Sequence, residues 1–221
     1  MKTNVEKTIK SLGARKNLTE AEVKGILREY GIPTPDYRIL KGGKIDKGLK
    51  LKYPVVLKVC SPEILHKTDV GGVALELKDE NELAKKAGEF AKKFKNADLL
   101  VEPMEKGNAE IIIGLLNDPT FGITIMFGMG GIFTEIYKDV VFRVVPIERF
   151  DAEQMLTDIK ARKLLEGFRN IKTDREAVID LLLKISKLGE DFEGKLDQMD
   201  LNPVFVKAKG VVVVDAKMIM K

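Results

Sequence analysis

The chain has 221 residues, of which 44% are hydrophobic and 33% are charged. This composition is typical of a globular protein with a sizeable core and excludes an intrinsically disordered chain. The 38 Lys and Arg residues nearly balance the 34 Asp and Glu residues, so the net charge of +4 does not indicate a nucleic-acid-binding surface. The single cysteine, Cys60, excludes an intrachain disulfide and is expected in the core. No apolar run resembles a signal peptide or reaches the roughly 18 residues of a membrane span, so we expect a cytoplasmic protein.

The first predicted elements are helical. Residues 1–18 carry weak signals and are predicted to form a helical arm. A clear helix is expected to begin at Thr19, which can form a capping box with Glu22. Apolar side chains then recur at helical spacing, and Gly31 followed by Pro33 ends the helix.

Short strands and one helix follow. Four apolar segments are predicted strands: residues 36–40, 54–59, 72–77 and 99–102. Between the last two, Asp79 is predicted to cap a helix, with Leu83, Ala87, Phe90, Ala91 and Phe94 on its apolar face. Together these segments predict a small αβ lobe.

A second lobe is predicted beyond residue 103. Residues 110–116 and 122–127 are predicted to form a hairpin, and residues 128–131 a glycine-rich loop. Two further strands are predicted, near residues 133–137 and at residues 140–146. Two or three helices are expected within residues 151–188, the clearest starting at a capping box of Thr173 and Glu176. A hairpin of residues 201–206 and 211–217 closes the chain.

The pattern therefore predicts an α/β (α+β) protein in three parts: a helical arm at residues 1–33, a small lobe at 34–103 and a large lobe at 104–221. Two αβ lobes joined by an extended hinge at residues 102–104 predict a nucleotide cleft between them.

The terminal hairpin gives the most geometric prediction. If pairing is symmetric about the turn at residues 207–210, Asn202 lies opposite Asp215, and Asp200 lies opposite Lys217. Side chains alternate along a strand, so Asp200, Asn202 and Asp215 share one face. An amide oxygen and a carboxylate in this arrangement suit Mg²⁺, which favours oxygen ligands. The alternative is an ordinary polar pair on the solvated face of a hairpin.

A second candidate lies in residues 61–73, which read SPEILHKTDVGGV. His66 is the only histidine of the chain, and a neutral imidazole nitrogen can accept a phosphoryl group near pH 7. Lys58 precedes the segment on an apolar strand, and it could place its charge at phosphate oxygens. Gly71 and Gly72 could present backbone N–H groups to the same oxygens. The alternatives are a solvent-facing lysine, a tight turn and an ordinary loop histidine.

Two glutamates flank the predicted hinge. Glu102 and Glu110 could contact the adenine or the ribose of a nucleotide, or they could be surface residues. The loop at residues 128–131, which reads GMGG, could admit a ligand or a partner backbone, or it could simply be a tight turn.

Together these pieces resemble one family. Residues 54–77, 109–147, 199–206 and 211–218 are similar, in the same order, to segments of the β subunit of ADP-forming acetyl-CoA (acyl-CoA) synthetases, which are related to succinyl-CoA synthetase. The resemblance runs from about residue 18 to residue 218. The histidine-containing segment distinguishes this family from other ATP-grasp ligases.

The resemblance implies an ATP-grasp fold and a set of site residues. His66 matches a phosphohistidine that passes its phosphoryl group to ADP, and Asp200 matches an acidic residue that orients an incoming phosphohistidine. The other matches bind the nucleotide or its metal ion: Lys58 at the phosphates, Glu102 and Met104 at the adenine hinge, Glu110 at a further nucleotide contact, and Asn202 and Asp215 at Mg²⁺.

The resemblance also implies the reversible conversion of acetyl-CoA, ADP and phosphate into acetate, ATP and CoA. An α subunit would carry the CoA-binding and acyl-phosphate chemistry, so we expect an α2β2 assembly of two α and two β subunits, without nucleic-acid or membrane partners. Two alternatives stay open: a stand-alone ATP-grasp carboxylate ligase and a nucleotide-sensing module without turnover. An acid-labile phosphate on His66 favours the synthetase, whereas ATP binding without a phosphoenzyme favours the sensor.

Overall fold

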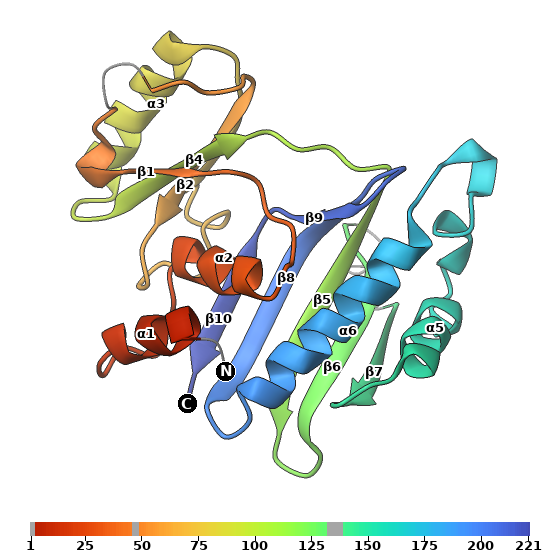
Figure 1. The fold of residues 1–221 in the computed structure, drawn as a ribbon. Coiled ribbons are helices and arrows are strands. Elements are labelled where there is room, and N and C mark those ends of the chain that lie inside the picture. The colour runs from red at the N-terminus through yellow and green to blue at the C-terminus, as the bar shows by residue number, and fades with distance from the viewer. Residues whose placement is uncertain (1–2, 46–48, 132–138) are drawn as a thin grey trace. The chain divides into compact units, whose positions relative to one another are not determined.

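A computed structural model describes residues 3–45, 49–131 and 139–221 of the chain (Figure 1). It divides the chain into two compact units, each built on its own sheet. The large unit comprises Met1–Leu18, Glu22–Thr34 and Lys106–Lys221, and the small unit comprises Thr19–Ala21 and Pro35–Glu105. No helix in the described part of the chain is long and apolar enough to cross a membrane. The predicted division into an arm and two lobes stays a prediction.

The small unit is a four-stranded antiparallel sheet with one long helix packed on it. Its strand order is β1-β4-β2-β3. The elements are β1 (Arg38–Leu40), a 3₁₀ turn (Lys41–Gly43), β2 (Val55–Cys60), β3 (Val73–Leu77), α3 (Glu80–Lys93) and β4 (Asp98–Pro103). The predicted cap of α3 is confirmed, because the Asp79 carboxylate accepts a hydrogen bond from the Glu82 N–H at 2.9 Å.

The large unit contains a six-stranded antiparallel sheet with the order β10-β8-β5-β6-β7, in which β9 also pairs with β8. Its strands are β5 (Ala109–Asp118), β6 (Gly122–Met129), β7 (Val140–Val144), β8 (Leu196–Val206), β9 (Val211–Val213) and β10 (Ala216–Met220). Its helices are α1 (Thr3–Ser11), α5 (Arg149–Asp158) and α6 (Arg175–Asp191), with 3₁₀ turns at Arg162–Leu164 and Phe168–Asn170. Helix α2 (Glu20–Glu29) begins in the small unit with Glu20 and Ala21 and continues in the large unit from Glu22. The strand predicted near residues 133–137 lies outside the described residues.

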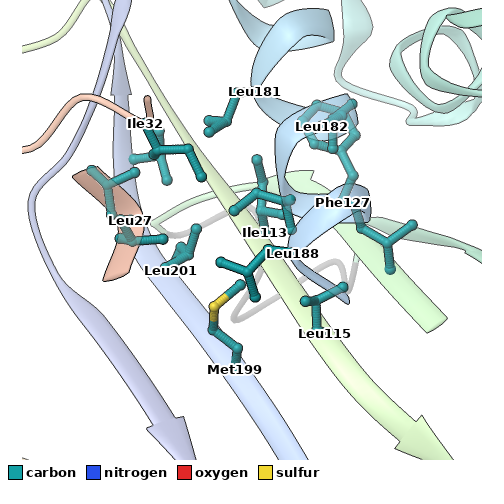
Figure 2. Packing of buried hydrophobic residues seen from close by; sticks show 14 of the residues in the cluster. Leu27, Ile32, Ile113, Leu115, Phe127, Leu181, Leu182, Leu188, Met199 and Leu201 are labelled. Carbon is teal, nitrogen blue, oxygen red and sulfur yellow. The ribbon is translucent and has the colours of Figure 1, made fainter. Parts of the chain in front are cut away.

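The core of the large unit forms where α6 lies along β5 and β6 (Figure 1). Leu182 and Leu188 of α6 meet alternate side chains of the sheet, such as Ile113, Leu115 and Phe127 (Figure 2). Burying one such side chain contributes about 1.5–3 kcal/mol, so these contacts supply much of the free energy that orders the sheet. The alternate, outward-facing positions of the same strands can therefore carry polar side chains.

The predicted register of the terminal hairpin is confirmed. Val206 pairs with Val211, and Asp200 pairs with Lys217. Between these pairs the second strand is interrupted, but the Asn202 N–H still donates to the Asp215 carbonyl at 3.3 Å. Asn202 and Asp215 therefore lie opposite each other, as expected.

The predicted start of the last long helix is wrong by one residue. Asp174 is the N-cap of α6, and its carboxylate accepts from the Ala177 N–H at 3.0 Å. Thr173 instead donates its hydroxyl to the Leu165 carbonyl at 2.9 Å. Glu176 pairs with Arg149 of α5 at 2.6 Å. Asp174 rather than Thr173 caps the helix because Asp174 also accepts a hydrogen bond from the Gly210 N–H in the hairpin turn, at 2.7 Å. The local sequence does not reveal this tertiary contact.

Candidate functional site

Lys58 is a buried cation at the centre of the small unit. It projects from β2, a strand whose residues are all buried, and its own side chain is 7% exposed. Its Nζ lies 2.8 Å from Glu20 Oε1 and 2.9 Å from Glu102 Oε1. A buried ammonium ion needs such partners because its desolvation is otherwise very costly.

A second lysine completes the arrangement. Lys67 Nζ lies 3.0 Å from Glu20 Oε2, with 9% of its side chain exposed. We call Glu20, Lys58, Lys67 and Glu102 the buried charge cluster. Its two positive and two negative groups balance, and Glu20 bridges the lysines with one oxygen each. The structure thus brings Lys58 and Glu102 together and adds two residues that sequence reasoning did not single out.

His66 lies beside this cluster in sequence, but it faces the solvent. Its side chain is 71% exposed, and its Nδ1 lies 3.9 Å from an oxygen of Asp69, which is also exposed. That distance is longer than a hydrogen bond, and most of the imidazole is accessible to solvent. An exposed ring suits a nucleophile that exchanges its phosphoryl group with a second molecule.

The backbone N–H groups of Gly71 and Gly72 are engaged within their own loop. The Gly71 N–H donates to the Thr68 carbonyl at 2.9 Å, and the Gly72 N–H donates to the Lys67 carbonyl at 2.6 Å. Gly71 adopts φ +63°, a conformation that favours glycine. A phosphate contact through these N–H groups would require the turn to open, so the geometry favours the tight-turn alternative for both residues.

The predicted hinge has its polar groups turned inward. The Glu102 side chain is 2% exposed and directed at Lys58. The Met104 N–H donates to the Pro54 carbonyl at 2.9 Å. A nucleotide base at this hinge would therefore have to use the carbonyl or the side chain of Met104.

The remaining candidates lie in the large unit. Asp200 and Asn202 are exposed positions of β8 that alternate with buried Met199 and Leu201. Asp215 is half-buried in the interruption opposite Asn202, where its carboxylate also accepts from the Ala216 N–H at 2.9 Å. An amide oxygen and a carboxylate facing each other fit Mg²⁺, a hard ion that keeps several waters. Within residues 3–45, 49–131 and 139–221, no three His, Cys, Asp or Glu side chains form a group that could hold a metal ion.

Glu110 lies on β5 against the glycine-rich loop. The Gly130 N–H donates to the Glu110 carbonyl at 2.8 Å, and a Cβ at Gly130 would lie only 3.1 Å from the Glu110 Cβ. Gly128 is part of β6, where a side chain would collide with the Asp139 carbonyl at 2.5 Å. Gly128 and Gly130 thus allow neighbouring backbone of the same unit to approach closely.

Comparison with known proteins decides the family. A model of the ATP-grasp domain matches residues 10–220. The chain is 46% identical over 221 aligned residues to the subunit beta of acetate–CoA ligase [ADP-forming] II of Pyrococcus furiosus, covering 94% of this chain and 93% of that protein. The chain belongs to the ATP-grasp family, among the beta subunits of ADP-forming acetate–CoA ligases. The fold class and the family expected from the sequence are thereby confirmed.

Two further relatives place this ATP-grasp chain in context. It is 40% identical over 92% of its length to acetate–CoA ligase [ADP-forming] II of Archaeoglobus fulgidus, but it spans only 30% of that protein. A solved structure of the acetyl-coenzyme A synthetase 1 of Ca. Korarchaeum cryptofilum matches with a TM-score of 0.84 and 40% identity, covering 98% of this chain and all of that one. That structure contains coenzyme A and Mg-AMPPCP, with its phosphohistidine segment pointing towards the nucleotide binding site.

The two cluster residues that the sequence analysis missed are Glu20 and Lys67. Each stands next to a position that was singled out, since Glu20 follows Thr19 and Lys67 follows His66. A glutamate in the first turn of a helix is common, because the positive end of the helix dipole stabilises its negative charge. Nothing local marks Glu20 as the partner of two lysines, the nearer of which lies 38 positions away in the chain.

Proposed function

We propose that this chain is the nucleotide-binding subunit of an ADP-forming acyl-CoA synthetase. With an alpha-type partner it would interconvert acetyl-CoA, ADP and phosphate with acetate, ATP and CoA. The single observation that carries the proposal is the 46% identity to a subunit beta across nearly the whole of both chains. The solvent-exposed His66 supports it, because a phosphoryl carrier has to be reachable.

In the direction of ATP synthesis, phosphorylated His66 would donate to ADP. The bond between phosphorus and the imidazole nitrogen breaks, and a bond to a β-phosphate oxygen of ADP forms. The imidazole leaves as the neutral ring after taking up one proton. Such a transfer depends on positioning and charge neutralisation more than on covalent assistance from the protein.

The other candidate residues would bind and orient the nucleotide. Lys58 would face the phosphates, and Glu102 with Met104 would lie at the base. Asn202 and Asp215 would hold Mg²⁺, which neutralises phosphate charge when it is bound. We further propose that Glu110 contacts the nucleotide and that Asp200 orients an incoming phosphohistidine.

The partner proposal comes from the names of the relatives. The Pyrococcus furiosus protein of similar length is called a subunit beta, whereas the longer Archaeoglobus fulgidus protein, of which this chain spans 30%, is called a ligase without a subunit designation. An alpha-type partner would supply the CoA-binding and acyl-phosphate chemistry. A closed α2β2 assembly is the stoichiometry that we propose, because most soluble oligomers have closed symmetry.

The test is phosphorylation of His66. Incubation with Mg²⁺ and γ-labelled ATP should give an acid-labile phosphate that peptide mass spectrometry locates at His66. His66→Ala should abolish this label and the overall synthesis of ATP, while the affinity for Mg-ATP stays within about twofold of wild type, because the ring reacts rather than anchors. A wild-type chain that binds ATP without ever becoming labelled would contradict the proposal and favour a nucleotide sensor.

A further inference from the structure

Glu20 and Lys67 are buried charged groups without a place in the chemistry described so far. Glu20 directs one oxygen to Lys58 Nζ at 2.8 Å and the other to Lys67 Nζ at 3.0 Å. Its side chain is only 2% exposed. One carboxylate thus contacts both the lysine proposed at the phosphates and the residue directly after the proposed nucleophile.

The chain around His66 is attached to the small unit at few points. Within residues 61–72, which we call the His66 segment, only Lys67 and Gly72 are buried. The Lys67 carbonyl accepts from the Gly72 N–H at 2.6 Å, and the Gly72 carbonyl accepts from the Val59 N–H of β2 at 2.8 Å. Ile64 packs partly against the core of the unit, and the exposed Val70 accepts at its carbonyl a hydrogen bond from Lys93 Nζ at 2.7 Å. Lys67 is therefore held through both its side chain and its backbone, while the adjacent His66 side chain stays in solvent.

We propose that Glu20 is a positioning residue for phosphoryl transfer. By fixing Lys67 it fixes the backbone from which His66 projects, and by fixing Lys58 it couples that backbone to the lysine at the phosphates. This inference rests on the proposed function of His66. Its physical basis is that reacting groups displaced by about 1 Å can lose on the order of 100-fold in rate.

The charge balance of the cluster explains why Glu20 controls the segment. Without its carboxylate, Lys67 would lose the ion pair that Glu20 makes with its Nζ at 3.0 Å. Losing an ion pair at a buried ammonium ion is strongly unfavourable, so Lys67, which lies on a loop, would move into solvent and release the His66 segment. Lys58 lies on β2, an inner strand of the sheet, so its ammonium group cannot move into solvent as that of Lys67 can.

Three variants separate positioning from folding. Glu20→Gln and Lys67→Met each break the anchor and unbalance the cluster, whereas the double variant breaks the anchor but leaves Lys58 and Glu102 as a balanced pair. We expect all three to slow the labelling of His66 by Mg-ATP by about 10- to 100-fold. The affinity of Lys67→Met for Mg-ATP should stay within about twofold of wild type. The double variant should be more stable to denaturant than either single variant, yet label just as slowly.

Hydrogen exchange gives a readout that does not depend on catalysis. In all three variants, amides of the His66 segment should exchange faster, and by a larger factor than those of β2 and α3. This comparison tests the anchor even if wild-type His66 is never labelled, an outcome that would refute the proposed function instead.

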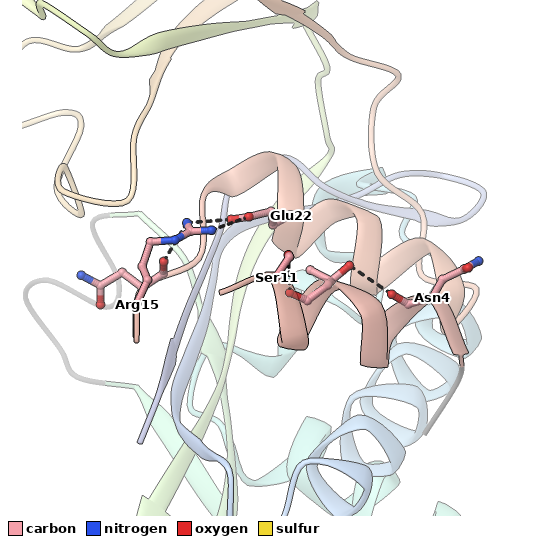
Figure 3. Close-up of polar contacts among 6 residues, drawn as sticks. Asn4, Ser11, Arg15 and Glu22 are labelled. Carbon is pink, nitrogen blue, oxygen red and sulfur yellow. Dashed lines mark hydrogen bonds and ion pairs between the residues drawn. The ribbon is translucent and has the colours of Figure 1, made fainter. Parts of the chain in front are cut away.

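A matched control lies on the same helix as Glu20. Glu22 lies two residues further along α2 and is part-exposed, with its carboxylate paired to Arg15 at 2.6 Å (Figure 3). Glu22→Gln should label at the wild-type rate. Labelling of Lys67→Met and of the double variant at the wild-type rate, or unchanged exchange of their His66 segments, would overturn the inference.

Discussion

Asn202 and Asp215 lie opposite each other on the terminal hairpin, but their side chains differ in the charge that they would present to a cation. The Asp215 carboxylate carries a full negative charge, whereas the Asn202 amide oxygen contributes only a dipole. Asp215 lies in the interruption between β9 and β10, and Asn202 lies opposite it on β8. For a hard ion such as Mg²⁺, the charged ligand should contribute more to binding.

Replacing these two proposed Mg²⁺ ligands should therefore have unequal effects. Asp215→Ala should weaken Mg²⁺-dependent binding of ATP by about 10- to 100-fold, the value of a charge-assisted contact, and Asn202→Ala should weaken it less. Asp197 is an exposed aspartate of the same strand β8, and Asp197→Ala serves as the control. Titration calorimetry at fixed Mg²⁺ measures all three affinities. Equal, unchanged affinities for Asp215→Ala and Asp197→Ala would contradict the metal assignment.

At the scale of elements, α6 shows how a helix start depends on a distant turn. Asp174 caps the helix through Ala177 and at the same time accepts from Gly210 in the turn between β8 and β9. The Gly210 N–H, followed by the Ala177 N–H, holds the pKa of Asp174 below its ordinary value. One ionised carboxylate thus joins the start of α6 to the terminal hairpin.

Asp174 should make the stability of the fold pH-dependent. A carboxylate whose pKa is lowered in the folded state stabilises it fully above the unfolded-state pKa of about 3.9, and this contribution is lost as the pH falls through the folded-state pKa. Asp174→Ala should lower the free energy of unfolding by about 1–2 kcal/mol at pH 7, and by progressively less below about pH 4. Urea denaturation across this range measures the difference. Asp180→Ala, an exposed aspartate of α6 paired with Lys184, should change the stability by less than about 0.5 kcal/mol.

The sequence predicted those elements whose signals are local. Short apolar segments located the strands of the described residues, and symmetry about the 207–210 turn placed Asn202 opposite Asp215. Thr173 and Asp174 both carry an oxygen that can cap a helix, so only the contact with Gly210 distinguished them. The buried charge cluster was out of reach for the same reason, because its members come from α2, β2, β4 and a loop that are far apart in the chain.

At the scale of the whole molecule, the proposed site residues are divided between the two units. His66, Lys58, Glu102 and Met104 belong to the small unit, and Glu110, Asp200, Asn202 and Asp215 belong to the large unit. All the strand pairings among the described residues are antiparallel, and each joins two strands of the same unit. Nucleotide binding and the histidine relay are the tasks that we assign to them, and acyl-phosphate formation is assigned to the partner.

This division of labour predicts that the isolated chain binds nucleotide but does not complete the reaction. We expect Mg-ATP binding by calorimetry, yet no release of CoA from acetyl-CoA in the presence of ADP and phosphate. Addition of an alpha-type subunit should restore that release, and the same addition to the His66→Ala variant should not, since the relay to ADP is then broken. Light scattering of the active complex should give a mass corresponding to two copies of each chain. Robust CoA release by the chain alone would refute the subunit assignment and favour a self-sufficient ligase, whereas release in the complex that persists without His66 would show that the phosphoryl group reaches ADP by another route.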